Sequence, residues 1–256
     1  MSPTAVITGA SGGIGAATAE SLVKAGYDVV VVARRADRLT DLAARTGGRA
    51  HQLDVTDASA VAGFAATLDS CDVLVNIAGG AFDASPVATG DPASWLSTFE
   101  VNVLGTLHMT QALLPLLGAG GGGTIVNLTS TAASVNYESG GSYSAAKHAA
   151  HALSETLRLE LAGQPVRVVE IAPGMVHTAE FALNRFHGDR AKADAVYAGV
   201  DGPLRAEDVA ECVRWAVTLP AHVNIDRLVV RPLAQAAQHK VHRGPIFATT
   251  TEEKQP

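Results

Sequence analysis

A tyrosine and a lysine in this chain are spaced so that they would lie on one face of a helix. Tyr143 and Lys147 stand four residues apart within the periodic segment 142–161, and four residues correspond to about one helical turn. A phenol has a pKa of about 10, which is too high for a base at neutral pH. A neighbouring ammonium group stabilises the phenolate and lowers this pKa, so the pair predicts proton transfer. Taken alone, however, the pair is more typical of a surface tyrosine that lies against the stem of a lysine.

Two further polar residues occur where they could act with this pair. Ser130 ends the strand-like segment TIVNLTS, and Asn102 lies inside a long helical pattern. Asparagine is mildly unfavourable inside a helix unless its amide has a specific role. Each residue has an ordinary interpretation, as a turn serine and as a buried, hydrogen-bonded amide. Their occurrence together with Tyr143 and Lys147 favours a catalytic group of four residues.

Short apolar segments rich in β-branched residues alternate with longer helical segments along the chain. Strands are predicted at 5–8, 28–33, 50–55, 72–79, 123–130, 166–173 and 226–232. Helices are predicted at 13–26, 36–47, 57–68, 92–117, 142–161 and 206–219. Strands this uniformly apolar are buried on both faces, as in a parallel sheet covered by helices. The predicted fold class is therefore α/β, a single Rossmann-type, doubly wound domain with a seven-stranded parallel sheet flanked by helices.

Three segments interrupt this alternation. The stretch GAGGGG at 118–123 follows a helix and precedes a strand, which predicts a flexible connection. Segment 176–202 follows the sixth strand at the sheet edge where ligands bind in this fold class, so it is predicted to be a lid. Residues 238–256 lack periodicity and are predicted to form an extended tail or a contact to another subunit. The domain is thus expected to span 1–237, with the lid included.

A glycine-rich turn, TGASGGIG, follows the first predicted strand directly. Gly9, Gly13 and Gly15 would form a tight turn in which backbone amides approach a pyrophosphate, and the helix that follows favours an anion at its N-terminus. Glycines also serve plain chain reversal, and the spacing here is Gly-x-x-x-Gly-x-Gly, not the commoner Gly-x-Gly-x-x-Gly. The order of strand, turn and helix nevertheless predicts dinucleotide binding.

The end of the second predicted strand indicates which dinucleotide binds. An acidic residue there would bind the adenosine ribose and disfavour a 2′-phosphate, but Asp28 stands at the beginning of this strand. The strand ends at Ala33, and the next residues are Arg34 and Arg35. Two guanidinium groups without a carboxylate suit a phosphate. Paired arginines are also common solvated residues, so the missing acid carries more of the argument. NADP(H) is therefore predicted over NAD.

Composition limits the remaining functions. The chain has 256 residues, is 47% hydrophobic and carries a net charge of -6, which predicts a globular protein without a nucleic-acid partner. Cys71 and Cys212 have no metal or redox spacing, which is typical of reduced thiols in a cytoplasmic protein. The N-terminus does not have the pattern of a signal peptide, and no apolar run approaches the length of a membrane span. We therefore expect a soluble, cytoplasmic protein with no membrane partner.

Histidine pairs offer a metal-binding alternative. His148 with His151, and His239 with His242, have three-residue spacing. Neither pair has a third ligand at a recognisable distance, so no metal site is predicted.

Ordered motifs along nearly the whole chain resemble the short-chain dehydrogenase/reductase family. They are TGASGGIG at 8–15, LDVTD at 53–57, NIAG at 76–79, VNVLG at 101–105, Ser130, YSAAK at 143–147 and APGMVHT at 172–178. The resemblance implies that Asn102, Ser130, Tyr143 and Lys147 form a catalytic tetrad. The cofactor contacts expected from these motifs and from the two arginines are Gly9, Ser11, Gly13, Ile14, Gly15, Arg34, Arg35, Asp54, Val55, Asn76, Ala78, Gly79, Tyr143, Lys147, Pro173, Gly174, Val176 and Thr178. Ile77 departs from the family, which usually has a second asparagine there.

The resemblance also implies what each member of the tetrad does. Tyr143 would remove the alcohol proton in oxidation and protonate the carbonyl oxygen in reduction, as hydride moves to or from the nicotinamide. Ser130 would hydrogen-bond that oxygen. Lys147, together with the positive nicotinamide, would stabilise the phenolate and would also hold the nicotinamide ribose. Asn102 would place a water that links Lys147 to solvent.

The lid sequence AEFALNRFHGDRAKA and the later stretch NIDRLVVRP look like a subgroup that includes NADP-dependent 3-hydroxy acid and serine dehydrogenases and related aldehyde reductases. Here Arg185, beside Phe181 and Phe186, would bind a substrate carboxylate, although a surface arginine explains it equally well. Ser130, Phe181 and Arg185 are the expected substrate-binding residues. We expect an NADP(H)-dependent oxidoreductase of a small polar 3-hydroxy acid or the matching oxo compound. The alternatives are a reductase of a specialised aldehyde or ketone, an NAD-linked enzyme, and a non-catalytic NADP-sensing module.

Family members are usually homotetramers built from pairs of long helices, which correspond here to 92–117 and 142–162. The second of these segments has an alanine-rich face that suits close approach of another helix, although this face could equally pack inside one subunit. A homotetramer is therefore expected.

Overall fold

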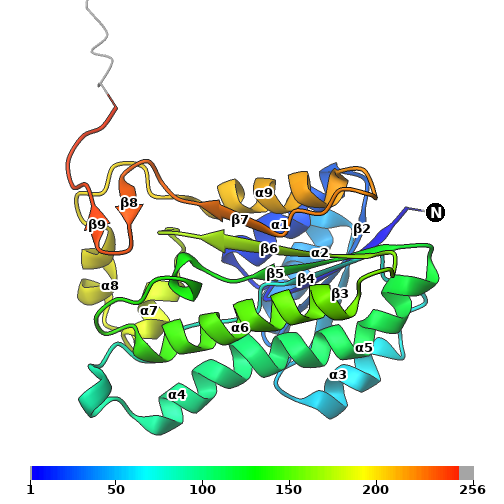
Figure 1. Ribbon diagram of the computed structural model, residues 1–256, viewed down its shortest axis with the longest axis horizontal. Helices are drawn as coiled ribbons and strands as arrows, with labels where there is room; N and C mark the ends of the chain where they lie inside the picture. Colours follow the sequence, from blue (N-terminus) through cyan, green and yellow to red (C-terminus); the bar gives the residue numbers. More distant parts are fainter. Residues whose placement is uncertain (1, 248–256) are drawn as a thin grey trace, which may run out of the picture.

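Seven parallel strands form the central sheet in the computed structural model, which describes residues 2–247 (Figure 1). The strands are β1 (Thr4–Thr8), β2 (Asp28–Ala33), β3 (Arg49–Gln52), β4 (Val73–Asn76), β5 (Gly123–Leu128), β6 (Val166–Pro173) and β7 (Arg227–Val230). Their order across the sheet is β3-β2-β1-β4-β5-β6-β7. The chain therefore winds outward in both directions from the β1–β4 pair, which confirms the predicted doubly wound fold.

Helices cover both faces of this sheet, because its strands are apolar on both sides. One face packs against α1 (Gly13–Lys24), α2 (Ala36–Thr46) and α9 (Ala206–Thr218). The other face packs against α3 (Ala58–Ala65), α5 (Gly105–Ala119) and α6 (Gly141–Glu160), as the two layers of Figure 1 show. Neighbouring strand residues alternate between these layers, so that Ala5 belongs to the first and Val6 to the second. The two hydrophobic layers hold the parallel strands between them, so that the carboxyl ends of the strands meet at one edge of the sheet.

The predicted helix 92–117 is interrupted. It consists of α4 (Pro92–Phe99), a π-helical turn η2 (Glu100–Leu104) and α5, which continues to Ala119. The Asp91 carboxylate caps the start of α4 by accepting the amide hydrogens of Ala93 and Ser94. A π turn is a common feature of functional sites and is invisible to a periodicity argument. The connection before β5 is consequently shorter than the predicted 118–123.

The lid contains two short helices, α7 (Phe181–Arg185) and α8 (Arg190–Tyr197). An antiparallel hairpin of β8 (Gln235–Ala237) and β9 (Lys240–Val241) follows the last sheet strand and lies beside α8 in Figure 1. Short 3-10 turns occupy Val87–Thr89 (η1) and Thr131–Ala133 (η3).

The beginning of the predicted tail is held by the lid of the same chain. Gly244 pairs with Val200, and the Asp201 carboxylate accepts the amide hydrogen of Ile246 at 2.8 Å. The predicted boundary after residue 237 therefore falls inside the β8–β9 hairpin. Residues 248–256 of the predicted tail lie outside the described residues.

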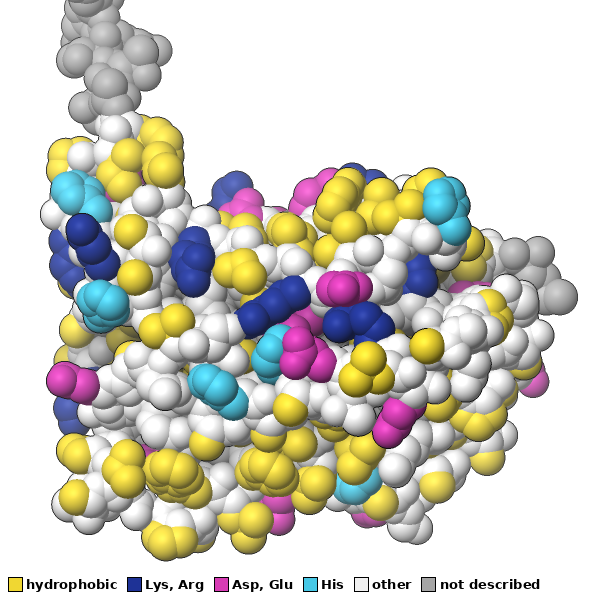
Figure 2. Space-filling model, in the orientation of Figure 1, with side chains coloured by type: hydrophobic (Ala, Val, Ile, Leu, Met, Phe, Trp, Pro, Cys, Tyr) yellow, Lys and Arg dark blue, Asp and Glu magenta, His cyan; other side chains and the backbone are white. Residues whose placement is uncertain are grey.

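Apolar side chains gather on the surface over α4, α5 and α6, along the lower part of the molecule in Figure 2. Leu96, Phe99 and Leu159 are exposed on these helices. Within residues 2–247, none of the helices is both long enough and apolar enough to cross a membrane.

Candidate active site

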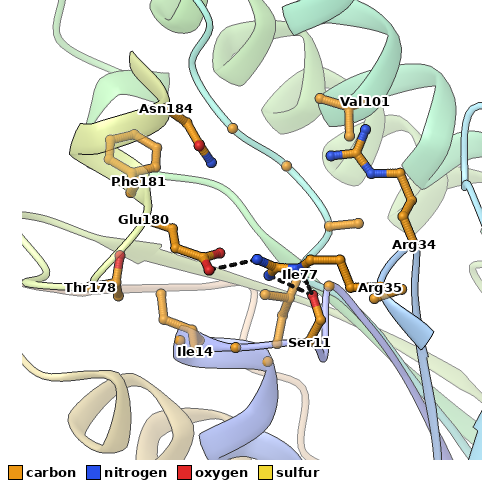
Figure 3. A pocket seen from close by; sticks show the side chains of 18 of the residues that line it. Ser11, Ile14, Arg34, Arg35, Ile77, Val101, Thr178, Glu180, Phe181 and Asn184 are labelled. Atoms are coloured by element: carbon orange, nitrogen blue, oxygen red, sulfur yellow. Dashed lines mark hydrogen bonds and ion pairs between the residues drawn. The ribbon is translucent and has the colours of Figure 1, made fainter. Parts of the chain in front are cut away.

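A cleft of about 410 Å³ lies where the carboxyl ends of β1 and β4 diverge (Figure 3). Ligands of open α/β sheets bind at this reversal of strand order. The glycine turn, the ends of β2, β3 and β4, and the first residues of the lid form its walls. The predicted cofactor contacts that line it are Gly9, Ser11, Gly13, Ile14, Gly15, Arg34, Arg35, Asp54, Val55, Ala78, Gly79 and Thr178.

The glycine turn is packed so closely that side chains at two of its positions would clash with neighbouring backbone. Gly9 has a φ of +67°, and a Cβ there would lie 2.8 Å from the amide nitrogen of Ala78. A Cβ on Gly15 would lie 2.4 Å from the Gly9 carbonyl oxygen. No side chain within residues 2–247 caps the N-terminus of α1, which begins at Gly13. This combination of a bare backbone turn and an uncapped helix start fits a pyrophosphate.

Basic side chains line the adenosine end of the cleft. The Nε and Nη2 atoms of Arg35 donate to Ser11 Oγ at 3.1 and 2.7 Å. β2 ends at Ala33, as predicted, so no carboxylate stands at its end. Arg34 points instead toward Val101, on the other side of the cleft in Figure 3. This donor set fits the 2′-phosphate of NADP(H).

A second cavity of about 260 Å³ adjoins the cleft and shares Ile14, Leu128, Thr178 and Phe181 with it. Helix α6, the segment after β5 and the lid contribute its reactive and charged side chains. Besides the shared Ile14, Thr178 and Phe181, the predicted residues that line it are Ser130, Tyr143, Pro173, Gly174, Val176 and Arg185. Four predicted cofactor residues, those at 143, 173, 174 and 176, thus line the second cavity and not the cleft.

Three members of the predicted tetrad converge between the two cavities. Helix α6 carries Tyr143 and Lys147 on one face, with Lys147 Nζ 5.7 Å from the centre of the phenol ring. Ser130 stands two residues after the end of β5, where its hydroxyl donates to the carbonyl oxygen of Pro173 at 3.4 Å and lies near the Tyr143 phenol. Lys147 Nζ donates to the carbonyl oxygen of Leu128 at 2.9 Å. The strand end and one helical turn therefore bring together groups that are 17 residues apart in the sequence.

Burial dominates the electrostatics of this pair. It raises the pKa of Tyr143, and the nearby Ser130 hydroxyl acts in the opposite direction without reversing the change. Burial lowers the pKa of Lys147 to about 8, against the attraction of the buried Glu170 carboxylate. Desolvation therefore dominates the tyrosine pKa in the protein without cofactor, whereas the predicted lowering includes the charge of a bound, oxidised nicotinamide. At neutral pH the phenol keeps its proton.

Asn102 lies in the π turn, close to Lys147. Its Nδ2 donates to the carbonyl oxygens of Gly80 and Thr98 at 2.8 and 2.7 Å, while its Oδ1 has no partner within residues 2–247. A Cβ on Gly79 would lie 2.5 Å from this Oδ1 and 3.6 Å from Lys147 Nζ. An unpartnered acceptor beside an ammonium group is suited to hold a water molecule.

The lid places Arg185 over the second cavity. The centre of its guanidinium group lies 5.1 Å from the Tyr137 ring and 5.7 Å from the Phe186 ring. Its Nη2 donates to the carbonyl oxygen of Ser139 at 2.7 Å, while the buried Nε has no partner within residues 2–247. Phe181 packs edge-on against Tyr143 with ring centres 5.3 Å apart. The arginine is therefore held near the Tyr143 phenol with part of its donor capacity free within the described residues.

A buried charged cluster lies behind the site. The Glu170 carboxylate is fully buried and accepts from Thr129 Oγ1 at 2.5 Å. His151 Nδ1 lies 2.6 Å from it, and Arg227 Nε lies 3.2 Å from it. Thr129 immediately precedes Ser130, so the cluster holds the segment that carries this predicted catalytic serine.

Two predicted cofactor residues, Asn76 and Lys147, line neither cavity, and several lining residues were not predicted. The side chain of Asn76 donates to Asn127 Oδ1 at 2.9 Å inside the core and does not reach the cleft. Arg38, Glu180 and Tyr137 line the cavities without having been predicted. Arg38 follows Arg35 at helical spacing, which is a signal that the sequence contains. Residues 2–247 contain no cluster of three or more potential metal ligands from His, Cys, Asp and Glu.

Fold and cleft together define a nicotinamide-dinucleotide oxidoreductase, and comparisons with known proteins agree. Residues 3–186 match the family model for short chain dehydrogenases. An uncharacterized oxidoreductase of Mycobacterium tuberculosis (strain H37Rv) is 53% identical over 242 residues, which cover 94% of this chain and 96% of that protein. Sulfoacetaldehyde reductase 2 of Chromohalobacter salexigens is 40% identical over 245 residues, 92% of this chain and 96% of the relative.

A solved structure shows the same fold with the cofactor. The closed form of a serine dehydrogenase complexed with NADP⁺ superimposes with a TM-score of 0.88 at 37% identity, covering 94% of this chain and 99% of that one. This chain belongs to the short-chain dehydrogenase family. It is an NADP-dependent enzyme of that family.

Proposed function

We propose that this enzyme interconverts a small 3-hydroxy acid, or a related anionic alcohol, and the matching oxo compound. The observation that carries the proposal is the second cavity, which Tyr143 and Ser130 line together with Arg185. A reactive oxygen and an anionic group of one small molecule would both find partners there. Phe181, packed against Tyr143, would exclude water from the reacting atoms.

The side chains of the site divide the remaining chemistry among them. Bound NADP(H) supplies or accepts the hydride. Tyr143 donates its hydroxyl proton to the carbonyl oxygen in reduction, a role that suits a phenol whose pKa is raised. Ser130 donates a hydrogen bond to the same oxygen as it gains negative charge. Asn102 Oδ1 holds a water toward Lys147, which relays protons to the site.

The names of the relatives support an anionic substrate. Serine is a 3-hydroxy acid, and sulfoacetaldehyde carries a sulfonate that one methylene group separates from its aldehyde carbon. Both compounds place an anionic group within a few bonds of the carbon that exchanges hydride. A guanidinium held between Tyr137 and Phe186 matches that geometry, because it can bind carboxylate and sulfonate alike.

The test is NADPH oxidation with a panel of substrates. The panel contains 3-oxo acids, sulfoacetaldehyde and neutral aldehydes of similar size. We expect anionic compounds to give the highest kcat/KM, and Tyr143→Phe to lower kcat by about 10²- to 10⁴-fold while NADPH still binds. Turnover of neutral carbonyls alone would favour the specialised reductase. NADPH binding without turnover of any compound would favour the cofactor-sensing module.

We also propose a cytoplasmic homotetramer. The exposed apolar side chains of Leu96, Phe99 and Leu159 on α4 and α6 support an interface over these helices, because a patch of this kind is typical of a surface covered in the assembly. Sedimentation equilibrium of the whole chain tests the stoichiometry, and a monomer would refute the proposal.

A further inference from the structure

The carboxylate of Glu180 reaches from the lid to the adenosine end of the cleft. Glu180 precedes α7 and lies two residues after Thr178, at the point where the lid begins. Its Oε1 accepts from Arg35 Nη1 at 2.6 Å and also from Arg38 Nη1. Figure 3 shows its carboxylate pointing at Arg35, which lies between Glu180 and Ser11. The pKa of Glu180 is lowered, chiefly by the hydrogen bond from Arg35, so it is an anion at neutral pH.

The same arginines form the donor set suited to a phosphate. Arg35 holds Ser11 Oγ through Nε and Nη2. A Cβ on Gly12 would lie 3.8 Å from both Arg35 Nη2 and Arg38 Nη1, so the two guanidinium groups lie over the glycine turn. Two guanidinium groups and a hydroxyl beside a bare backbone turn are typical of a site for a doubly charged phosphate. In this structure the anion that meets these donors is the carboxylate of Glu180.

We propose that Glu180 is a cofactor-specificity residue that competes with the adenosine 2′-phosphate of NADP(H) for Arg35 and Arg38. The phosphate displaces the carboxylate because two anions side by side repel each other and share the same donors. NAD(H) has no 2′-phosphate and leaves the ion pairs in place. NADP(H) binding therefore also releases the first residues of the lid from α2. This inference rests on placing the 2′-phosphate at Ser11 and Arg35, the donors that the cleft offers beside the glycine turn.

The exposure of the three side chains sets the size of the effect. The side chains of Arg35, Glu180 and Arg38 are 40%, 33% and 50% exposed. Ion pairs exposed to this degree change an equilibrium by a factor of about five or less each. The phosphate can therefore displace Glu180, and removing its charge should tighten NADP(H) binding about three- to tenfold.

The experiment measures cofactor affinity and does not depend on turnover. Glu180→Gln removes the charge and keeps the shape of the side chain. Glu20→Gln is the matched control, because Glu20 forms a comparable exposed ion pair with Arg45, 3.0 Å apart, between α1 and α2 and outside the cleft. NADPH and NADH are titrated by fluorescence, and adenosine 2′,5′-bisphosphate and AMP by calorimetry, at low and high salt.

We expect Glu180→Gln to increase the affinity for NADPH and for adenosine 2′,5′-bisphosphate three- to tenfold. The affinities for NADH and AMP should change less than twofold. At high salt the difference between the two pairs of ligands should disappear, because salt screens these charges. The control should change none of them. Weaker NADPH binding by Glu180→Gln would mean that the carboxylate positions Arg35 for the phosphate, and unchanged binding would mean that it does not compete; either result overturns the proposal.

A further variant, Arg35→Gln, separates this failure from a wrong placement of the cofactor. If Arg35→Gln lowers the affinity for NADPH while Glu180→Gln has no effect, the 2′-phosphate does bind at Arg35, and only the competition with Glu180 is refuted. If Arg35→Gln leaves NADPH affinity unchanged, the phosphate lies elsewhere, and both the placement and the competition are overturned.

Discussion

Replacement of Lys147 by methionine should stabilise the fold while it abolishes turnover. Lys147 is buried, and burial lowers its pKa from 10.5 to about 8. Each pH unit of such a change corresponds to about 1.4 kcal/mol. The charged side chain therefore costs the folded state about 3 kcal/mol at pH 7. Methionine is a flexible apolar side chain that can occupy the space of the lysine stem without this cost.

One contact offsets part of the gain. The hydrogen bond from Lys147 Nζ to the Leu128 carbonyl is lost, and a hydrogen bond contributes about 1 kcal/mol. A net stabilisation of about 2 kcal/mol remains, which corresponds to a rise in Tm of roughly 4–8 °C for a chain of this length.

The pH dependence follows from the sign of the pKa change. Between about pH 8 and 10.5 the unfolded chain binds this proton more tightly than the folded chain, so wild-type stability rises with pH in that window. The cost is complete below pH 8 and disappears as the lysine loses its proton. The advantage of Lys147→Met should accordingly be largest at pH 7 and small at pH 10.

The assay is urea unfolding of the protein without added cofactor, at pH 7 and pH 10 and at one protein concentration. Lys24→Met is the control, because Lys24 is exposed at the end of α1 and its loss should change stability by less than about 0.5 kcal/mol. A Lys147→Met protein that is less stable than wild type at pH 7, or an advantage that does not depend on pH, would refute the reasoning. Either result would mean that the Glu170 carboxylate compensates the buried ammonium group fully.

Two further predictions concern the substrate and the glycine turn. Arg185→Ala should raise KM for carboxylate substrates about tenfold or more, since a charged hydrogen bond contributes about 1.5–3 kcal/mol. KM for neutral carbonyls should stay nearly unchanged. Equal effects on both substrate classes in steady-state kinetics would show that Arg185 does not bind the carboxylate. Gly15→Ala should weaken NADPH binding and lower Tm, because the new Cβ would lie 2.4 Å from the Gly9 carbonyl oxygen and the turn must open; Gly118→Ala, where a Cβ meets nothing within 4 Å, is the control in a fluorescence titration and a melting curve.

Local sequence patterns predicted the framework because the physics behind them is local. The β6 strand was predicted at its observed bounds, Val166–Pro173, because this short, mostly apolar and β-branched segment between helical segments is typical of a buried strand. The same holds for the turn before α1, where the order of strand, glycines and helix suffices. Tyr143 and Lys147 were placed on one helix face by their spacing alone.

Longer-range features escaped prediction. The π turn that carries Asn102 is followed by Gly105, where a Cβ would lie 2.5 Å from the Val55 side chain, so this glycine reflects a packing contact with a distant residue that periodicity does not reveal. Residues 235–247 pair with each other and with the lid. These paired segments are short and have little strand propensity, so the periodicity of the sequence does not predict them. The hydrogen bond from Asn76 to Asn127 forms because β4 and β5 are neighbours in the sheet, which the sequence pattern does not reveal.

The sequence by itself determined the order of strands and helices, the cofactor class and the chemical types of the reacting groups, since each depends on neighbours within a few residues. Only the tertiary structure decided how those groups behave. Desolvation raises the pKa of Tyr143 and lowers that of Lys147, and it arises from the packing of β5, α6 and the lid around them. The same packing brings Glu180 to Arg35, 145 residues away in the sequence. Burial and long-range contact are properties of the folded surface, so a linear pattern does not contain them.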